Sequence, residues 1–296
     1  MPINRKIMGV SRGGGGKKAI FGYGYTTVAV SITNLVNSTG AVSTDTTGVG
    51  TARYSLASAS YGTDKAIFGY GIGTVNLSLT NLVSNVGVVS TDTTGVGTVR
   101  QALASASYGT DEAIFGYGSG PVSMTNLVSN VGVVSTDTTG VGTARSSLAA
   151  ASYGTDKAIF GYGSTGSAVS LTNLVSNVGV VSTDTTGVGT ARSSLAAANY
   201  GTDKAIFGYG NGPVSITNLV SNVGVVSTDT TGVGTARDQL AAASYSTDKA
   251  IFGYGFTGSL AATSITNLVS SVGVVGSNVT GVGTSRRFIA ASSYGS

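Results

Sequence analysis

The sequence predicts an all-β protein, a six-bladed β-propeller of four-stranded antiparallel blades. The phrase AIFGYG recurs every 45 or 47 residues, and a period of this length is typical of propellers and helical arrays. Gly, Val, Thr and Ser fill every repeat without an apolar stripe of helical spacing, which excludes the arrays. The last repeat stops half-way, at a phrase whose continuation stands near the start of the chain. AIFGYG begins at Ala19, Ala66, Ala113, Ala158, Ala205 and Ala250.

Each repeat is expected to contain four short strands. In the repeat that follows Arg145, the first strand is SLAAASYG, whose small side chains suit the crowded innermost position, and Gly-Thr-Asp supplies a turn. KAIFGYG is apolar on both faces, as expected for a strand between neighbouring sheets. A variable loop precedes the last two strands, which a Gly turn separates. The expected strands cover 147–154, 157–163, 169–177 and 180–186.

The two ends of the chain are expected to complete one blade and close the ring. RRFIAASSYGS supplies an innermost strand, and KKAIFGYG supplies the strand that follows it in the other repeats. A linear solenoid normally ends in atypical caps rather than complementary half-repeats; a solenoid or a fibrous β-prism is the alternative. The propeller is expected to cover 17–296, with blades at 286–296 plus 17–52, then 53–99, 100–144, 145–191, 192–236 and 237–285.

Residues 1–16 are expected to form a flexible, basic, Gly-rich tail. Five cations and no acid fall in the first 18 residues, whereas 11 cations face 12 acids from residue 19 onward. The body is therefore close to neutral, and a groove specific for nucleic acid is not expected. A solvated leader with a GGGG linker is the favoured interpretation of the tail, and contact with an acidic partner or a phosphate is the alternative.

No targeting, membrane or cysteine signal is found in the sequence. Polar residues and Gly interrupt every apolar stretch, so no membrane span is expected. No secretory signal peptide follows Met1. The chain has no Cys, which leaves neither a disulfide framework nor a thiolate metal site.

Catalysis, cofactors and metals are not expected. The chain has no His, and ten of its 12 acids occur in repeated phrases, where turns and pairs with Lys or Arg explain them better than a unique catalytic role. Asp238 and Glu112 are the exceptions. Paired-carboxylate glycosidase chemistry is a distant alternative. GYGSTG (161–166) and GYGFTG (253–258) satisfy G-x-G-x-x-G, but strand-like sequence follows them instead of the helix that a dinucleotide site needs.

Two resemblances rest on these repeated phrases. The stretch from the repeated Arg through LAAASYGTDKAIFGYG resembles the start of a kelch repeat, and TNLVSNVGVVSTDTTGVGTAR is similar to its second half. This resemblance implies a propeller blade. The near-identical wording of the repeats also resembles tandem-repeat proteins of tailed bacteriophages of aquatic bacteria, which implies a structural or fibre protein of the virion.

Two positions vary freely between repeats whose other residues barely change. They are the loop after the second strand and the residue pair after the repeated Arg. In an antiparallel blade both emerge at the same end, so they are expected to share one face, where binding specificity usually resides on a rigid scaffold. Unconstrained loops are the equally weighted alternative. The candidate binding residues are Tyr25, Ile72, Tyr54, Gln101, Asp238, Phe256, Arg287 and Phe288.

Two function classes follow. The first is a non-enzymatic structural or adhesive component of a phage particle, located in the virion or outside the cell, with other virion proteins or a cell-surface glycan as partner. The alternative is a lectin-like propeller that binds carbohydrate through Tyr, Asn and Thr.

Overall fold

The computed structural model describes residues 17–258 and 261–295, so the expected tail at 1–16 lies outside the described residues. Within them the chain forms strands β1 to β20 and no helix, and hence no helix that could cross a membrane. Three strands of each repeat are named by their order from the molecular axis. The inner strands are β3 (Ala57–Tyr61), β6 (Ala104–Tyr108), β9 (Ala149–Tyr153), β12 (Ala196–Tyr200), β16 (Ala241–Tyr245) and β20 (Ala290–Tyr294).

The remaining strands lie further from the axis. The middle strands are β1 (Lys18–Gly22), β4 (Lys65–Gly69), β7 (Glu112–Gly118), β10 (Lys157–Gly161), β13 (Lys204–Gly210) and β17 (Lys249–Gly253). The outer strands are β2 (Thr33–Val36), β5 (Thr80–Val83), β8 (Val122–Val128), β11 (Thr172–Val175), β14 (Val214–Val220) and β19 (Thr266–Val269). Two further short strands are β15 (Arg237–Asp238) and β18 (Phe256–Thr257).

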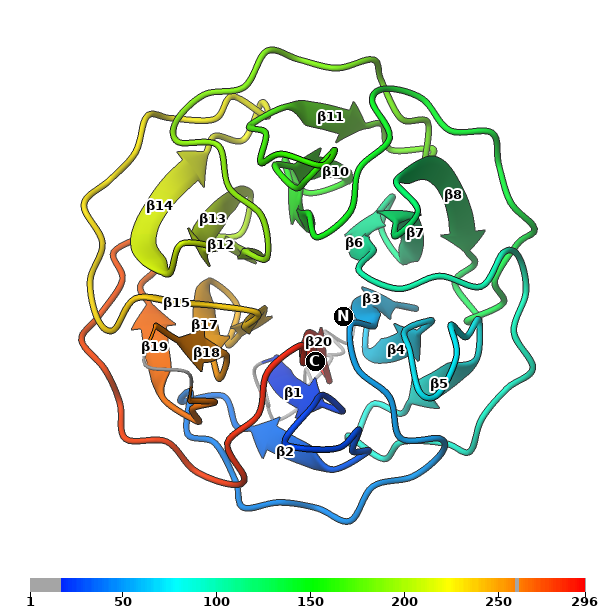
Figure 1. Cartoon of the computed structure of the whole chain (residues 1–296), viewed down its shortest axis with the longest axis vertical. Helices are drawn as coiled ribbons and strands as arrows, with labels where there is room; N and C mark the ends of the chain where they lie inside the picture. Colours follow the sequence, from blue (N-terminus) through cyan, green and yellow to red (C-terminus); the bar gives the residue numbers. More distant parts are fainter. Residues whose placement is uncertain (1–16, 259–260, 296) are drawn as a thin grey trace, which may run out of the picture.

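The described residues form six antiparallel sheets, each with a middle strand between an inner and an outer strand. Figure 1 shows the sheets arranged around one axis, with the inner strands nearest to it. The inner strands contact one another in the order β3, β6, β9, β12, β16, β20, and β20 in turn contacts β3. Strands β15 and β18 extend the β12–β13–β14 sheet to five strands.

The sheet β2–β1–β20 combines strands from opposite ends of the sequence. β20 pairs with β1 in antiparallel register, with Ala19 opposite Ser293 and Phe21 opposite Ala291. β2 pairs with the other edge of β1. The inner strand at 290–294 and the middle strand at 18–22 therefore have the same relation as β3 and β4 within a single repeat.

The prediction of a fourth strand at 180–186 is wrong, because this segment and its counterparts do not extend the sheets as strands. They make only isolated bridges to the outer strand, such as Val175 with Val181 and Thr172 with Thr185. Side chains replace part of the backbone ladder between these bridges. The Leu174 N–H donates to Ser182 Oγ at 3.0 Å, and the Ser182 carbonyl accepts from Asn173 Nδ2 at 3.0 Å.

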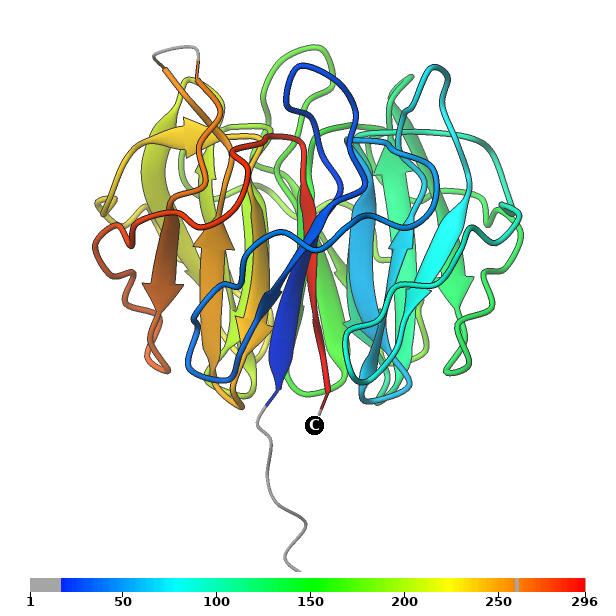
Figure 2. The ribbon, with the colours of Figure 1, turned by 90° about the horizontal axis from the view of Figure 1, so that it is seen from below.

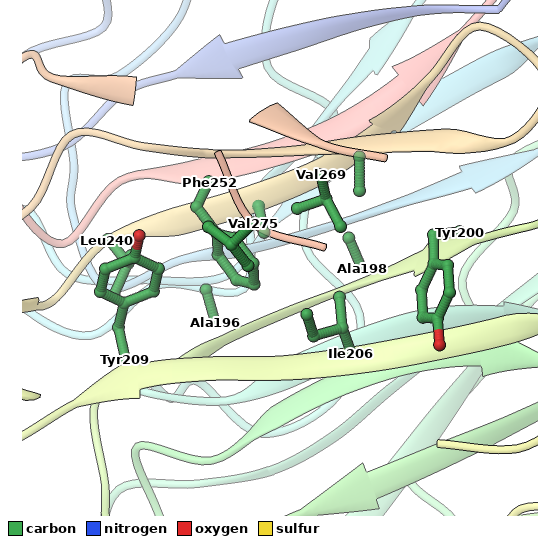
Figure 3. Close-up of a cluster of buried hydrophobic side chains, with 11 residues drawn as sticks. Ala196, Ala198, Tyr200, Ile206, Tyr209, Leu240, Phe252, Val269 and Val275 are labelled. Atoms are coloured by element: carbon green, nitrogen blue, oxygen red, sulfur yellow. The ribbon is translucent and has the colours of Figure 1, made fainter. Parts of the chain in front are cut away.

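The core consists of side chains packed between neighbouring sheets. Ala, Ile, Phe and Tyr of every middle-strand phrase are 0% exposed, as expected for a strand covered on both faces. Figure 3 shows one such layer, in which Ile206 and Tyr209 of one repeat lie near Phe252 of the next. The first Gly of each phrase makes room for this packing, since a Cβ on Gly69 would lie 2.7 Å from Phe115 Cζ.

One buried Arg per repeat joins neighbouring sheets. The Arg53 guanidinium lies 4.4 Å from the centre of the Tyr23 ring in the preceding repeat. Its Nε donates to the Tyr70 carbonyl at 2.8 Å, and its Nη2 donates to Asn81 Oδ1 at 2.7 Å. Asp92 lies 3.7 Å from Nη1 and accepts from the Thr51 N–H at 3.0 Å. The network thus connects three successive parts of the chain and satisfies a charge that is 0% exposed.

Candidate binding face

The two variable positions of each repeat meet at one face of the molecule, which we call the variable face. Tyr25 forms a bridge with Arg287, and Tyr54 forms one with Ile72. Asp238 pairs with Phe256 through β15 and β18. Figure 2 shows the loop after β1 rising at this face, while β20 runs to the opposite face. The backbone therefore holds each variable loop against the residue pair that follows a repeated Arg.

Five candidate residues from three neighbouring repeats form one cluster, which we call the aromatic patch: Tyr25, Tyr54, Phe256, Arg287 and Phe288. The Tyr54 ring lies 5.0 Å from that of Tyr25 and 5.8 Å from that of Phe288. The Arg287 guanidinium lies 4.4 Å from the centre of the Phe256 ring. All five side chains are half-buried. The patch therefore combines apolar ring surface with one positive charge.

Arg287 differs from the repeated arginines in its partners. Its guanidinium also lies 5.6 Å from the Tyr25 ring and 5.5 Å from the Phe288 ring. No ion pair or side-chain hydrogen bond of Arg287 is found within residues 17–258 and 261–295. Its N–H donors are therefore not committed to a carboxylate of the described chain.

The other three candidate residues, Asp238, Ile72 and Gln101, are not part of the aromatic patch. Asp238, at the candidate binding face, is only 4% exposed, so its side chain offers little surface to a partner. Burial raises the pKa of Asp238, and the positive charge of Arg287 counteracts that rise. Ile72 is half-buried beside Tyr54. Gln101 accepts a hydrogen bond at its carbonyl from the Ser119 N–H at 2.8 Å, in a neighbouring polar repeat.

The rest of the variable face is polar. Ser146 forms a bridge with Ser164, and the Asn211 N–H donates to the Ser193 carbonyl at 2.7 Å. The Ser146–Ser164 bridge has the same backbone pairing as Tyr54 and Ile72, whereas Asn211 lies in the tighter turn between β13 and β14. Both repeats carry small hydroxyl or amide side chains, so the face is divided chemically.

A ring of main-chain hydrogen bonds surrounds the axial mouth at the variable face. The Phe288 N–H donates to the Gln239 carbonyl at 2.8 Å, and the Ser55 N–H donates to the Phe288 carbonyl at 3.0 Å. Each member has a φ of 52° to 54°, a left-handed conformation that is unfavourable for residues other than glycine. No local sequence pattern predicts this ring, because its members include Ser, Ala, Gln and Phe. They are Ser55, Ala102, Ser147, Ser194, Gln239 and Phe288.

A second set of hydrogen bonds joins the turns of the opposite face. The Gly62 N–H donates to the Asp111 carbonyl at 2.7 Å, and the same contact recurs between the following repeats. Here too both ends of the sequence take part. The Ser246 N–H donates to the Lys17 carbonyl at 2.6 Å, and the Gly295 N–H donates to the Asp64 carbonyl at 2.7 Å.

The axial passage is lined by Ala, Ser and Asn199 of the inner strands and widens to a cavity of about 140 Å³ at the opposite face. Its hydroxyl groups bond mainly to neighbouring strands. Ser107 Oγ donates to the Ser60 carbonyl at 2.8 Å, and Ser152 Oγ donates to the Ser107 carbonyl at 2.8 Å. These side chains therefore help to hold the inner strands together.

Most of the repeated acids have structural partners for their side chains. Partial burial alone would raise the pKa of Asp92, but hydrogen bonds from Thr51 and Asn81 and the charge of Arg53 hold it below its ordinary value. Asp64 lies 3.2 Å from the Lys65 ammonium group. No group of three or more acids that could share a metal ion is found within the described ranges.

Each G-x-G-x-x-G match begins at the last residue of a middle strand. Gly161 ends β10 and Gly253 ends β17, and the next elements are strands rather than helices. Neither match therefore has the following helix whose N-terminus would bind a pyrophosphate.

In comparisons with known proteins, no family model and no curated protein matches the chain.

Proposed function

We propose that the chain is a closed six-bladed β-propeller that works by display and contact, without turnover, as a structural or surface-attachment component of a phage particle. The closed ring is supported by the β1–β20 pairing and by the hydrogen bonds that encircle the axis through Phe288 and Ser55. The assignment to a virion, or to the outside of the cell, rests on the resemblance of the repeats to phage tandem-repeat proteins. The kelch-like character of the blades is part of the same proposal.

The observation that carries the binding role is the contrast between scaffold and face. The repeated residues are buried or paired within the scaffold, as Arg53, Phe68 and Tyr70 are. The residues that differ between repeats meet on the variable face. A rigid ring that holds diverse loops on one side is suited to recognition of a surface or a partner.

A carbohydrate-binding propeller is the second candidate, and the aromatic patch favours it. Half-buried rings such as Tyr54 and Phe288 offer flat apolar surface, and Tyr hydroxyl groups add hydrogen-bonding capacity. The two candidates overlap if the particle attaches to a glycan.

The test combines location with adsorption. We expect the protein in purified phage particles, and we expect the isolated protein to adsorb to host cells. The variant Tyr25→Ala/Phe256→Ala/Phe288→Ala should adsorb at least tenfold more weakly, because it removes most of the ring surface. The matched control Ser119→Ala/Ser164→Ala/Asn211→Ala changes the polar part of the same face and should adsorb normally.

Two results would contradict the proposal. Absence of the protein from purified particles would remove the virion assignment. Full adsorption by the aromatic triple variant, with a normal melting temperature, would remove the variable face as the working surface.

A further inference from the structure

The aromatic patch gathers the aromatic residues that have no repeated counterpart. Of the 14 Tyr and 8 Phe, 18 occupy three repeated positions, six at each. The repeated aromatics of the scaffold are at most 3% exposed. The four others are Tyr25, Tyr54, Phe256 and Phe288, and all four lie in the patch. The repeated scaffold does not explain why all four of these aromatic residues lie at one place.

The aromatic patch also holds a positive charge that is not part of the repeated scaffold. From residue 19 onward, Arg287 is the only Arg without a repeated counterpart. It lies against Phe256 at 4.4 Å and near Asp238, whose Oδ1 is buried without a hydrogen-bond partner in the described chain. A guanidinium that packs against an aromatic ring can still donate N–H groups from its edge.

These features select the chemistry of a ligand. A planar fork of N–H donors matches a carboxylate, which it can bind through two parallel hydrogen bonds. Ring surfaces such as those of Tyr54 and Phe288 suit the apolar C–H faces of a sugar, and the Tyr hydroxyl groups suit its hydroxyls. A neutral saccharide would leave the guanidinium without its best partner.

Resting on the proposed contact function, we infer that the aromatic patch binds a carboxylate-bearing saccharide, with Arg287 holding the carboxylate and the rings of Tyr25, Tyr54 and Phe288 packing against the sugar. Phe256 supports the guanidinium from beneath. The ligand class is an acidic surface polysaccharide or its oligosaccharides.

The competing interpretation is a structural clasp. Tyr25 and Arg287 pair through two main-chain hydrogen bonds, with N···O distances of 2.8 and 3.0 Å, and they join the two ends of the sequence. A clasp would need the rings for stability and would have no preference for carboxylate. Binding and stability must therefore be measured on the same variants.

The experiment is a binding assay of the full chain on an array of uronic and sialic acid oligosaccharides. Each is paired with its methyl ester, and neutral and sulfated oligosaccharides are included. We expect binding to at least one carboxylate glycan and loss of that binding when the carboxylate is esterified. Arg287→Gln should weaken it about tenfold to a hundredfold. Arg287→Lys should retain part of it, because the charge remains but the fork is lost.

The controls separate the outcomes. Ser164→Ala lies on the same face outside the patch and should bind normally, and Arg287→Gln should melt within a few degrees of the unmodified protein. The inference is overturned if no carboxylate glycan binds, if esters, neutral or sulfated glycans bind as well as the carboxylates, or if Arg287→Gln keeps full binding. Recovery of the protein from particles in those cases would leave the proposed function standing.

Discussion

Each buried Arg makes contacts that a Lys could not reproduce. The Arg145 guanidinium donates to the Tyr162 carbonyl at 2.8 Å and also to Asn173 Oδ1, and it packs against the Tyr117 ring at 4.6 Å. A Lys ammonium group is a point charge without the planar fork that reaches these acceptors together. The Arg side chain therefore joins neighbouring repeats by its geometry as well as its charge.

One of these networks is incomplete. Asn278 occupies the position where the other repeats carry Asp, and Arg237 has no ion pair there among the described residues. Its Nε also lacks a hydrogen-bond partner. In the preceding repeat, Asp229 lies 3.8 Å from Arg192 and accepts from Thr190.

We predict that Asn278→Asp stabilises the protein by about 0.5–1 kcal/mol, because it supplies the missing ion pair and accepts from the Thr235 hydroxyl, to which the Asn278 amide donates in the natural chain. Denaturant unfolding measures the change. The matched variant Asp229→Asn should destabilise by a similar amount. If Asn278→Asp were destabilising, this explanation of the Arg–Asp pairs would be wrong.

The same aspartates set the response to acid. Partial burial alone would raise the pKa of these carboxyl groups, but hydrogen bonds and the charge of the neighbouring Arg together hold it below the ordinary value of 3.8. The residues are Asp45, Asp92, Asp137, Asp184 and Asp229. Folding therefore favours their charged form, and this stabilisation is present above pH 3.8 and is lost as the pH falls through the lowered values.

We predict a melting temperature that falls steeply below about pH 4 as these aspartates become protonated. Differential scanning calorimetry over a series of pH values provides the measurement. Asp229→Asn should show a shallower fall than the unmodified protein, since it removes one titrating group. An equal fall in both proteins would contradict the role given to Asp229.

At the scale of the element, the middle strand depends on the glycine that faces the next sheet. The Phe115 ring lies where a Gly69 side chain would be, and Phe68 has the same relation to Gly22. The rings are surrounded by 0% exposed neighbours and have little space to move.

We predict that Gly69→Ala destabilises the protein by about 1–3 kcal/mol through overpacking against Phe115. The control is Gly258→Ala, whose new Cβ would meet only Pro213 among the described residues, at 3.9 Å, and should be nearly neutral. Chemical denaturation compares the two variants. Equal stability of both would show that the sheets adjust to the added methyl group.

Much of this element could be predicted from the sequence. The apolar phrase KAIFGYG predicted a strand covered on both faces, and the AAAS run predicted a strand near the axis, because both depend on local side-chain size and polarity. The failure of 180–186 to form a strand could not be predicted, since Ser182 and Asn173 use side chains that no local pattern marks as ladder substitutes.

At the scale of the whole molecule, the two ends of the sequence contribute both to the sheet β2–β1–β20 and to the aromatic patch. Comparison of the repeats predicted which positions vary and that they share an end of the blade. It did not predict that Tyr25, Tyr54 and Phe288 would contact one another, because ring orientation depends on how successive sheets are placed around the axis. The comparison also did not predict that Asp238 is buried, because burial likewise depends on how successive sheets are placed around the axis.

Strands from both ends of the sequence complete the sheet β2–β1–β20, and the proposed ring closure depends on this pairing. The most direct measurement is disulfide formation in the variant Ala19→Cys/Ser293→Cys, since these residues are opposite one another and the natural chain has no Cys. The control Ala19→Cys/Ala291→Cys places the thiols two residues out of register, too far apart for a disulfide.

We expect an intramolecular disulfide in the first variant, with no free thiol, a monomeric chain and an added stability of up to about 5 kcal/mol from the long loop that it closes. The out-of-register control should keep its free thiols. Free thiols in Ala19→Cys/Ser293→Cys under oxidising conditions, or disulfides only between chains, would contradict the closed ring.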